Sequence, residues 1–240
     1  MIENSFAIIK NNYRRVLTNV ELSAHSVRRD PKSVKLLVVT KGHPIDTVKA
    51  VISAGCTCLG ENYVEDALPK IEALAEKNIE WHMIGHVQSR KARPVSEHFS
   101  WVHSVDRLKL ARRLNNFSRE IGRVMPVLLE CNVSSEASKF GWSVWDEKRW
   151  PKFVSEIAPL MELTNLEVRG LMTMPPFDPD PEKSRPFYVR LHRLRDYLAE
   201  QFPQVDWSEL SMGMSGDYQV AVQEGATIVR VGTAIVGQRS

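Results

Sequence analysis

A lysine at the end of an apolar run is the first residue of this 240-residue chain that could do chemistry. Lys41 ends the run 36–41, and period-2 alternation places it on the same face as Leu37 and Val39. On an inward face the amine would lose hydration, which lowers its pKa and supplies the neutral nucleophile that forms a Schiff base with an aldehyde. A lysine at a strand end also commonly extends to water, so strand position alone leaves both interpretations open.

Two loops rich in glycine and hydroxyl side chains follow the last two predicted strands. The first loop spans 211–217, with the sequence SMGMSGD, and the second spans 230–233, with the sequence RVGT. Glycine lets the backbone approach a ligand closely, and N–H groups and hydroxyls together bind anions. The glycines would also suit tight turns without a ligand. Two such loops on neighbouring strands nevertheless favour a phosphate site.

Arg230 is the third candidate, since it shares a strand face with Ile228 and Gly232. It could form an outward salt bridge, or it could be a permanent donor aimed at an acceptor on a ligand. An amine that binds aldehydes, a phosphate site and this arginine together indicate pyridoxal 5′-phosphate (PLP). Because arginine does not release its proton, a guanidinium at the pyridine nitrogen would keep that nitrogen unprotonated and make the ring a poor electron sink.

Two close pairs of metal-ligand residue types do not form a recognisable metal motif. His82 and His86 lie on a predicted strand, whereas the zinc-protease motif needs a helix with a glutamate between its histidines. We expect one packed imidazole and one at the site. Cys56 and Cys58 lie on one predicted strand face without a second cysteine pair, so we expect buried, inert thiols. The sequence therefore predicts no metal site.

The elements that position these residues alternate regularly between short apolar strands and longer helices. A helix over 1–28 precedes eight strand–helix units, and Asp106 is expected to cap the helix that Gly122 ends. Eight such units favour a single-domain (β/α)8 TIM barrel over residues 1–240, with the helix 1–28 packed on it; an open doubly wound sheet is the alternative. The carboxyl ends of barrel strands carry the active site. The predicted strands are 36–41, 56–61, 81–86, 101–105, 124–133, 168–174, 209–214 and 227–231.

The composition is that of an ordinary globular protein with few distinguishing features. Hydrophobic residues make up 43% and charged residues 25%, which excludes disorder over most of the chain. The net charge of +3 argues against nucleic acid as a partner, and no apolar stretch is long enough to span a membrane. Three cysteines, with no signal-peptide pattern, lead us to expect a cytoplasmic protein.

Several segments of the sequence resemble the pyridoxal phosphate homeostasis protein family, also called YggS/PROSC-like PLP-binding proteins, and they occur in the same order as in that family. The resemblance runs from about residue 35 to the C-terminus and implies a barrel like the N-terminal domain of alanine racemase (PLP fold type III). A looser match covers 130–141, to which we transfer no role. The matching segments are Val39–Lys41, Gly60–Val64, Trp81–Ser89, His103–Asp106, Gly170–Met174, Ser211–Asp217 and Val229–Gly232.

The resemblance also implies roles for individual residues. Lys41 would carry PLP as a Schiff base, and Arg230 would face the pyridine nitrogen. A threonine, Thr40, stands before the lysine where the family commonly has serine. The remaining residues expected at the cofactor are Ser211, Ser215, Gly232 and Thr233 at the phosphate, with Gly213 in the same loop, and Asn62, His86 and Met212 around it.

The function that the resemblance implies is PLP homeostasis and supply, without robust catalysis. The expected partners are PLP and PLP-dependent apoenzymes, and the expected oligomeric state is a monomer. The alternative is a PLP-dependent amino-acid racemase that uses Lys41 as one acid/base. A second base on the opposite face of the substrate is then needed, and Tyr63 and Tyr218 are the tyrosines that we expect near the site. Because the chain ends at Ser240, we expect no second domain to supply that base.

Overall fold

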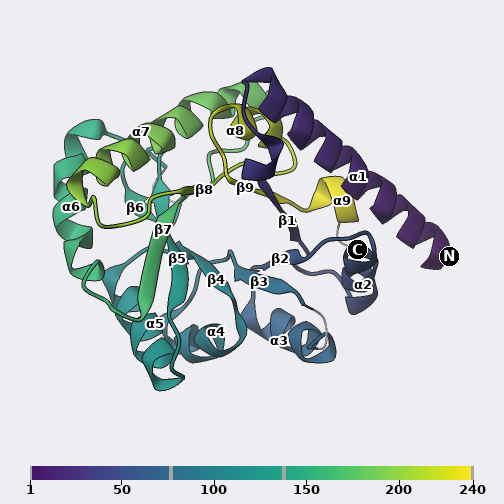
Figure 1. The fold of residues 1–240 in the computed structure, drawn as a ribbon, viewed down its shortest axis with the longest axis horizontal. Helices are drawn as coiled ribbons and strands as arrows, with labels where there is room; N and C mark the ends of the chain where they lie inside the picture. Colours follow the sequence, from purple (N-terminus) through teal and green to yellow (C-terminus); the bar gives the residue numbers. More distant parts are fainter. Residues whose placement is uncertain (1, 76–77, 137–138, 239–240) are drawn as a thin grey trace.

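Eight parallel strands close into a barrel in the computed structural model, which describes residues 2–75, 78–136 and 139–238 (Figure 1). Around the barrel the order is β1-β2-β3-β4-β5-β7-β8-β9, and the β9–β1 and β4–β5 pairings complete the ring. The predicted barrel is thus confirmed, and the open sheet is not. The strands are β1 (Lys35–Val39), β2 (Cys58–Glu61), β3 (Glu80–Met83), β4 (Trp101–Val105), β5 (Met125–Asn132), β7 (Leu166–Met172), β8 (Glu209–Ser211) and β9 (Ile228–Val231).

Helices surround this barrel, as expected for crossover connections between parallel strands. Single-turn 3-10 segments flank α4, α6 and α7. A two-residue strand, β6 (Trp142–Ser143), pairs with β5 outside the ring and was not predicted. The helices are α1 (Ile2–Ser26), α2 (Ile45–Ser53), α3 (Val64–Ala73), α4 (Ala92–His98), α5 (Leu108–Glu120), α6 (Trp150–Ile157), α7 (Arg185–Gln201), α8 (Tyr218–Gln223) and α9 (Thr233–Val236).

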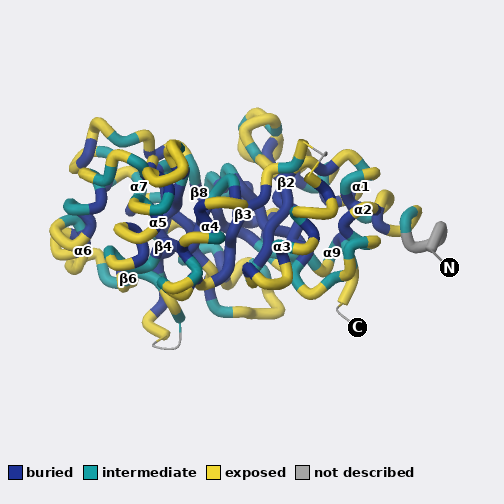
Figure 2. The backbone as a smooth tube through the Cα atoms, turned by 90° about the horizontal axis from the view of Figure 1, so that it is seen from below, coloured by how far each residue is buried: buried dark blue, intermediate teal, exposed yellow. Residues whose placement is uncertain are grey.

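Strand alternation divides the core into an outer layer under the helices and a small cluster inside the barrel. In β1, Leu36 and Val38 pack outward, whereas Leu37 and Val39 point inward. Figure 2 shows the buried residues along the centre and the exposed residues on the outside. The interior apolar cluster consists of Leu37, Val39, Cys58, Ile84, Leu128, Met172 and Ile228.

The N-terminal helix packs on the barrel's outer helices. α1 contacts α2, α8 and α9, and buries Tyr13, Val16 and Val20 along one face (Figure 1). The Asn12 amide donates to the carbonyl of Ile235 in α9 at 3.1 Å. Within the described residues, we find no helix with the length and apolar character needed to cross a bilayer.

Three details of the sequence interpretation are wrong. β1 ends at Val39, so Lys41 lies in the turn after the strand instead of ending it. Asp106 does not cap α5, whose first turn has no side-chain cap, because the Asp106 carboxylate binds His86 and Arg107. The two thiols do not share a face, since Cys58 lies inside the barrel and Cys56 in the outer layer.

Candidate functional site

The turn that carries Lys41 lies beside the glycine loop that follows β9. β9 is the neighbour of β1 in the ring, and Val38 pairs with Val231. A Cβ atom at Gly232 would lie 3.2 Å from the carbonyl oxygen of Val39, so the two backbones approach closely there. The half-buried Lys41 follows Val39 by two residues. The predicted amine and the predicted phosphate loop are therefore neighbours at the carboxyl ends of adjacent strands.

The hydroxyl of Ser215 joins the two loops that were predicted to bind phosphate. Its Oγ accepts hydrogen bonds from the backbone N–H groups of Gly232, at 3.2 Å, and Ala234, at 3.3 Å. Gly213 has a φ of +92°, a conformation that favours glycine, and its carbonyl accepts from the N–H of Arg230 at 2.9 Å. Two backbone donors and a hydroxyl thus converge where the two loops meet, and these are group types that bind anions.

Arg230 lies inside the barrel and is almost completely buried. Its guanidinium donates to Ser211 Oγ at 2.6 Å and to the carbonyl of Thr173 at 2.8 Å. Burial lowers the pKa of this guanidinium, although arginine stays protonated. Within the described ranges no carboxylate forms an ion pair with it. A buried cation held only by neutral acceptors still has capacity to donate to a ligand.

A chain of polar side chains crosses the barrel interior from Arg230 to β3. Ser211 Oγ lies 2.9 Å from His103 Nδ1, and His103 Nε2 lies 2.8 Å from His82 Nδ1. Burial lowers the pKa of both imidazoles, which keeps the rings neutral at physiological pH. The two neutral rings can hold Ser211 in place through hydrogen bonds, and they add no second positive charge beside Arg230. The sequence interpretation anticipated a packed imidazole at His82 but not the role of His103.

A buried ion pair supports the Lys41 turn from the other side. Lys70 Nζ, on α3, lies 2.8 Å from Glu61 Oε1 and donates to the carbonyl of Thr40 at 3.1 Å. The Thr40 hydroxyl donates to the same carboxylate oxygen at 2.7 Å. Thr40 is thereby fixed through both its carbonyl and its side chain. Helical periodicity gave no sign of this contact, because it depends on how α3 packs against β1 and β2.

A cleft of about 410 Å³ opens at the barrel mouth over the ends of β2, β3 and β5. Asn62 and His86, which the family resemblance leads us to expect around the cofactor, both line this cleft. His86 Nδ1 lies 3.0 Å from the Asp106 carboxylate, and its ring stacks on Phe140 at 4.0 Å between centroids. These two contacts fix the imidazole at the edge of the site.

Glu130 also lines this cleft and was missing from the predicted site. Burial, the largest cause, and the negative charge of Asp106 raise the pKa of the Glu130 carboxyl to about 7. Its Oε2 atom is buried and has no hydrogen-bond partner. A carboxyl with that environment exchanges a proton near neutral pH. The pattern 124–133 identified a strand but not which of its side chains would be desolvated.

Two residues that we expected near the cofactor, Met212 and Tyr218, do not face the barrel mouth. Met212 is fully buried in the outer core layer. The hydroxyl of Tyr218 accepts a hydrogen bond from Asn19 of α1, so this tyrosine faces the N-terminal helix. Tyr63 does line the cleft and is about half exposed. The other predicted residues lie together at the ends of β8 and β9, next to the Lys41 turn. They are Ser211, Gly213, Ser215, Arg230, Gly232 and Thr233.

Comparison with known proteins places the chain among relatives over nearly all of its length. The family model described as "Alanine racemase, N-terminal domain" matches residues 12–240. A pyridoxal phosphate homeostasis protein of Vibrio alginolyticus is 40% identical over 236 residues, which covers 96% of this chain and 97% of that protein.

Solved structures agree with this placement. PipY of Synechococcus elongatus, solved with PLP bound, is 35% identical with a TM-score of 0.79, covering 91% of this chain and 100% of PipY. Alanine racemase of Streptomyces lavendulae, at 16% identity and a TM-score of 0.70, shares the fold over 96% of this chain and 56% of its own. The chain therefore belongs to the pyridoxal phosphate homeostasis protein family, whose barrel is that of the alanine racemase N-terminal domain.

Proposed function

We propose that this protein binds PLP in the barrel mouth and serves the homeostasis and supply of that cofactor. The observation that carries the proposal is Arg230, a buried guanidinium with two neutral acceptors and no carboxylate partner among the described residues. Such a group suits a ligand acceptor, and the anion loop beside it suits a phosphate. The donor set therefore fits PLP, which PipY binds.

Each side chain has a distinct part in holding the cofactor. Lys41 supplies the amine that attaches the aldehyde as a Schiff base, and Arg230 donates to the pyridine nitrogen. Ser211, Ser215, Gly232 and Thr233 bind the phosphate, while Asn62, His86 and Gly213 shape the surroundings. When bound, PLP would supply an aldehyde that exchanges between amines. The fixed positive charge of Arg230 disfavours protonation of the ring and therefore strong carbanion chemistry.

Supply, rather than turnover, is the function that this arrangement supports best. The relatives are named for homeostasis, and an unprotonated ring suits storage and release of the cofactor. The chain would act as one PLP-binding unit over residues 1–240, in the cytoplasm, and would pass PLP to apoenzymes. As a racemase it would need a second acid/base beside Lys41, and the structure turns Tyr218 towards α1.

The first experiment locates the attachment point of the cofactor. Purified protein loaded with PLP is reduced with borohydride and digested, and the modified peptide is identified by mass spectrometry. We expect the adduct on Lys41 and its loss, together with the imine absorbance band, in Lys41→Ala. Lys49→Ala, which removes an exposed lysine of α2, is the matched control and should retain both.

Two outcomes would contradict the proposal. An adduct on another lysine in the wild type would transfer the site elsewhere. Steady exchange of the α-hydrogen of alanine for deuterium, dependent on Lys41, would establish the racemase in place of the supply protein.

A further inference from the structure

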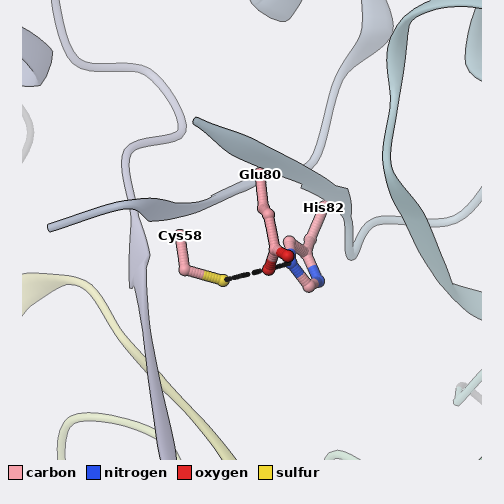
Figure 3. Close-up of side chains that lie close together, drawn as sticks. All are labelled: Cys58, Glu80 and His82. Carbon is pink, nitrogen blue, oxygen red and sulfur yellow. Dashed lines mark hydrogen bonds and ion pairs between the residues drawn. The ribbon is translucent and has the colours of Figure 1, made fainter. Parts of the chain in front are cut away.

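A second cluster of reactive side chains lies at the opposite end of the barrel from Lys41. Cys58 points inward from β2, while Glu80 and His82 come from the start of the neighbouring strand β3 (Figure 3). Cys58 is paired in register with Glu80, which brings the three side chains together. Cys58 and His82 are buried, and Glu80 is about half exposed at the barrel's base. His82 also belongs to the polar chain that runs through His103 to Ser211, whereas Cys58 and Glu80 have no part in the proposed PLP site.

The three ligand atoms are spaced like three corners of a tetrahedron. Cys58 Sγ lies 3.1 Å from His82 Nε2 and 3.8 Å from Glu80 Oε2, and the nitrogen and oxygen lie 3.5 Å apart. A zinc ion with bonds of about 2.3 Å to sulfur and about 2.0–2.1 Å to nitrogen or oxygen separates its tetrahedral ligands by about 3.3–3.6 Å. The cluster matches that spacing with adjustments of a few tenths of an ångström.

His82 is already oriented as a metal ligand. Its Nδ1 lies 2.8 Å from His103 Nε2, and its ring stacks on Trp101 with 5.7 Å between centroids. A hydrogen bond at the second nitrogen fixes the ring and the tautomer of metal-bound histidines. Nε2 is thus directed at Cys58 and Glu80, with little freedom to turn away.

One cation already competes for the cluster. Lys35 Nζ lies 2.9 Å from Glu80 Oε2, and its side chain is 40% exposed, which gives it room to withdraw into water. The ammonium neutralises the carboxylate in the absence of an ion. Its presence shows that this position favours positive charge, and its removal should favour a metal.

We propose that Cys58, Glu80 and His82 form a site for a thiophilic divalent cation, with Zn²⁺ as the best match, at the base of the barrel. A thiolate, an imidazole and a carboxylate are the donor types that zinc prefers, and the exposed side of Glu80 leaves the fourth position to water. On binding, three coordinate bonds form and the Cys58 thiol proton passes to solvent. With Nε2 bound to the metal, the ring proton of His82 lies on Nδ1 and donates to His103 Nε2.

The test measures metal content rather than activity. Full-length protein is dialysed to equilibrium against buffered Zn²⁺, and the zinc bound per chain is determined by mass spectrometry. We expect one zinc per chain, weakened at least about 100-fold in Cys58→Ser and in His82→Asn, because even residues behind the ligands commonly cost about 10–100-fold. Cys56→Ser, which changes the neighbouring buried thiol outside the cluster, should bind like the wild type.

Two further measurements distinguish a specific metal site from adventitious binding and from misfolding of the variants. Lys35→Met should bind zinc more tightly than the wild type, an effect that a misfolded variant would not show. Cobalt in place of zinc should give a thiolate-to-cobalt charge-transfer band that Cys58→Ser loses. Absence of stoichiometric zinc in the wild type, or binding that survives both ligand substitutions, would overturn the proposal, and neither result depends on PLP.

Discussion

Two buried ionisable side chains near the barrel mouth are satisfied very differently. Arg230 donates two hydrogen bonds at 2.6 and 2.8 Å, whereas Glu130 Oε2 has no partner. A buried polar atom without a partner costs about 1–3 kcal/mol, and more when it is charged. The ionised Glu130 carboxylate should therefore limit the free energy of unfolding above neutral pH.

Replacing Glu130 should reveal this penalty through its pH dependence. The folded pKa of about 7 lies above the ordinary value of 4.5 for a glutamate, so the folded state holds the proton more tightly and the free energy of unfolding falls as pH rises between these values. Glu130→Gln removes the titration. In urea unfolding of the PLP-free protein, we expect the variant to gain on the wild type between pH 5 and pH 8, by up to about 3 kcal/mol.

The control for that measurement is Glu136→Gln, an exposed carboxylate near the same strand. Its stability difference from the wild type should stay small at both pH values. If Glu130→Gln differed from the wild type by the same amount at pH 5 and pH 8, the raised pKa would be refuted.

Sequence patterns predicted the residues whose position follows from strand alternation and failed for those that depend on tertiary contacts. Alternation correctly grouped Leu37 with Val39 on one strand face and Arg230 with Ile228 on another, and the structure turns both faces into the barrel. It gave no access to Lys70 or Glu130, because the helix packing and desolvation that define them involve distant segments. The sequence can thus indicate which reactive side chains lie near one strand end. It does not indicate which side chains from other elements pack against them.

At the scale of elements, α3 is tied to the ends of β1 and β2 by one lysine. Lys70 contacts both the Glu61 carboxylate and the Thr40 carbonyl, and all three residues are buried. Desolvation makes such a pair costly to break from one side, because the remaining charge stays buried. The pair holds the strand end that precedes Lys41.

Lys70→Met should therefore destabilise the protein strongly. We expect a loss of about 3–5 kcal/mol in urea unfolding, since Glu61 is left buried without its cation. Lys152→Met, which breaks an exposed pair on α6, should cost less than about 1 kcal/mol. Adding Glu61→Gln to Lys70→Met should recover much of the loss, and a double variant no more stable than Lys70→Met alone would contradict this explanation.

Element boundaries were predicted less well than element types. The predicted strand 81–86 ends at Met83 as β3, and β8 covers three residues of the predicted strand 209–214. Strand ends in this barrel are set by where a ladder partner is available. β8 and β9 share a single register pair, Ser211 with Ile228, so the rest of the predicted strand is free to form the anion loop.

At the scale of the whole molecule, the N-terminal helix reaches the last element of the chain. Asn12 of α1 donates to the Ile235 carbonyl in α9, and α9 begins directly after Gly232 of the phosphate loop. The middle of α1 thus contacts the helix that directly follows the proposed phosphate loop. This contact should help to fix the loop that α9 follows.

Loss of the Asn12 amide should weaken PLP binding without touching the site. For Asn12→Ala we expect the Kd for PLP, followed by absorbance titration, to rise by up to about fivefold, equivalent to about 1 kcal/mol for one hydrogen bond. Asn11→Ala, at an exposed position on the same helix, should leave the Kd unchanged. Equal affinities in the two variants would show that α1 does not influence the loop.

The polar chain through the barrel interior has one more effect, on how the strands align during folding. His82, His103, Ser211 and Arg230 come from four different strands, and each is buried with its partner on another strand. A one-residue shift in the register of any of these strands would turn its polar side chain outward. The remaining polar side chains would then lie in the barrel interior without hydrogen-bond partners. These four hydrogen-bonded side chains therefore favour the barrel with the native strand register and disfavour closed barrels with a shifted register.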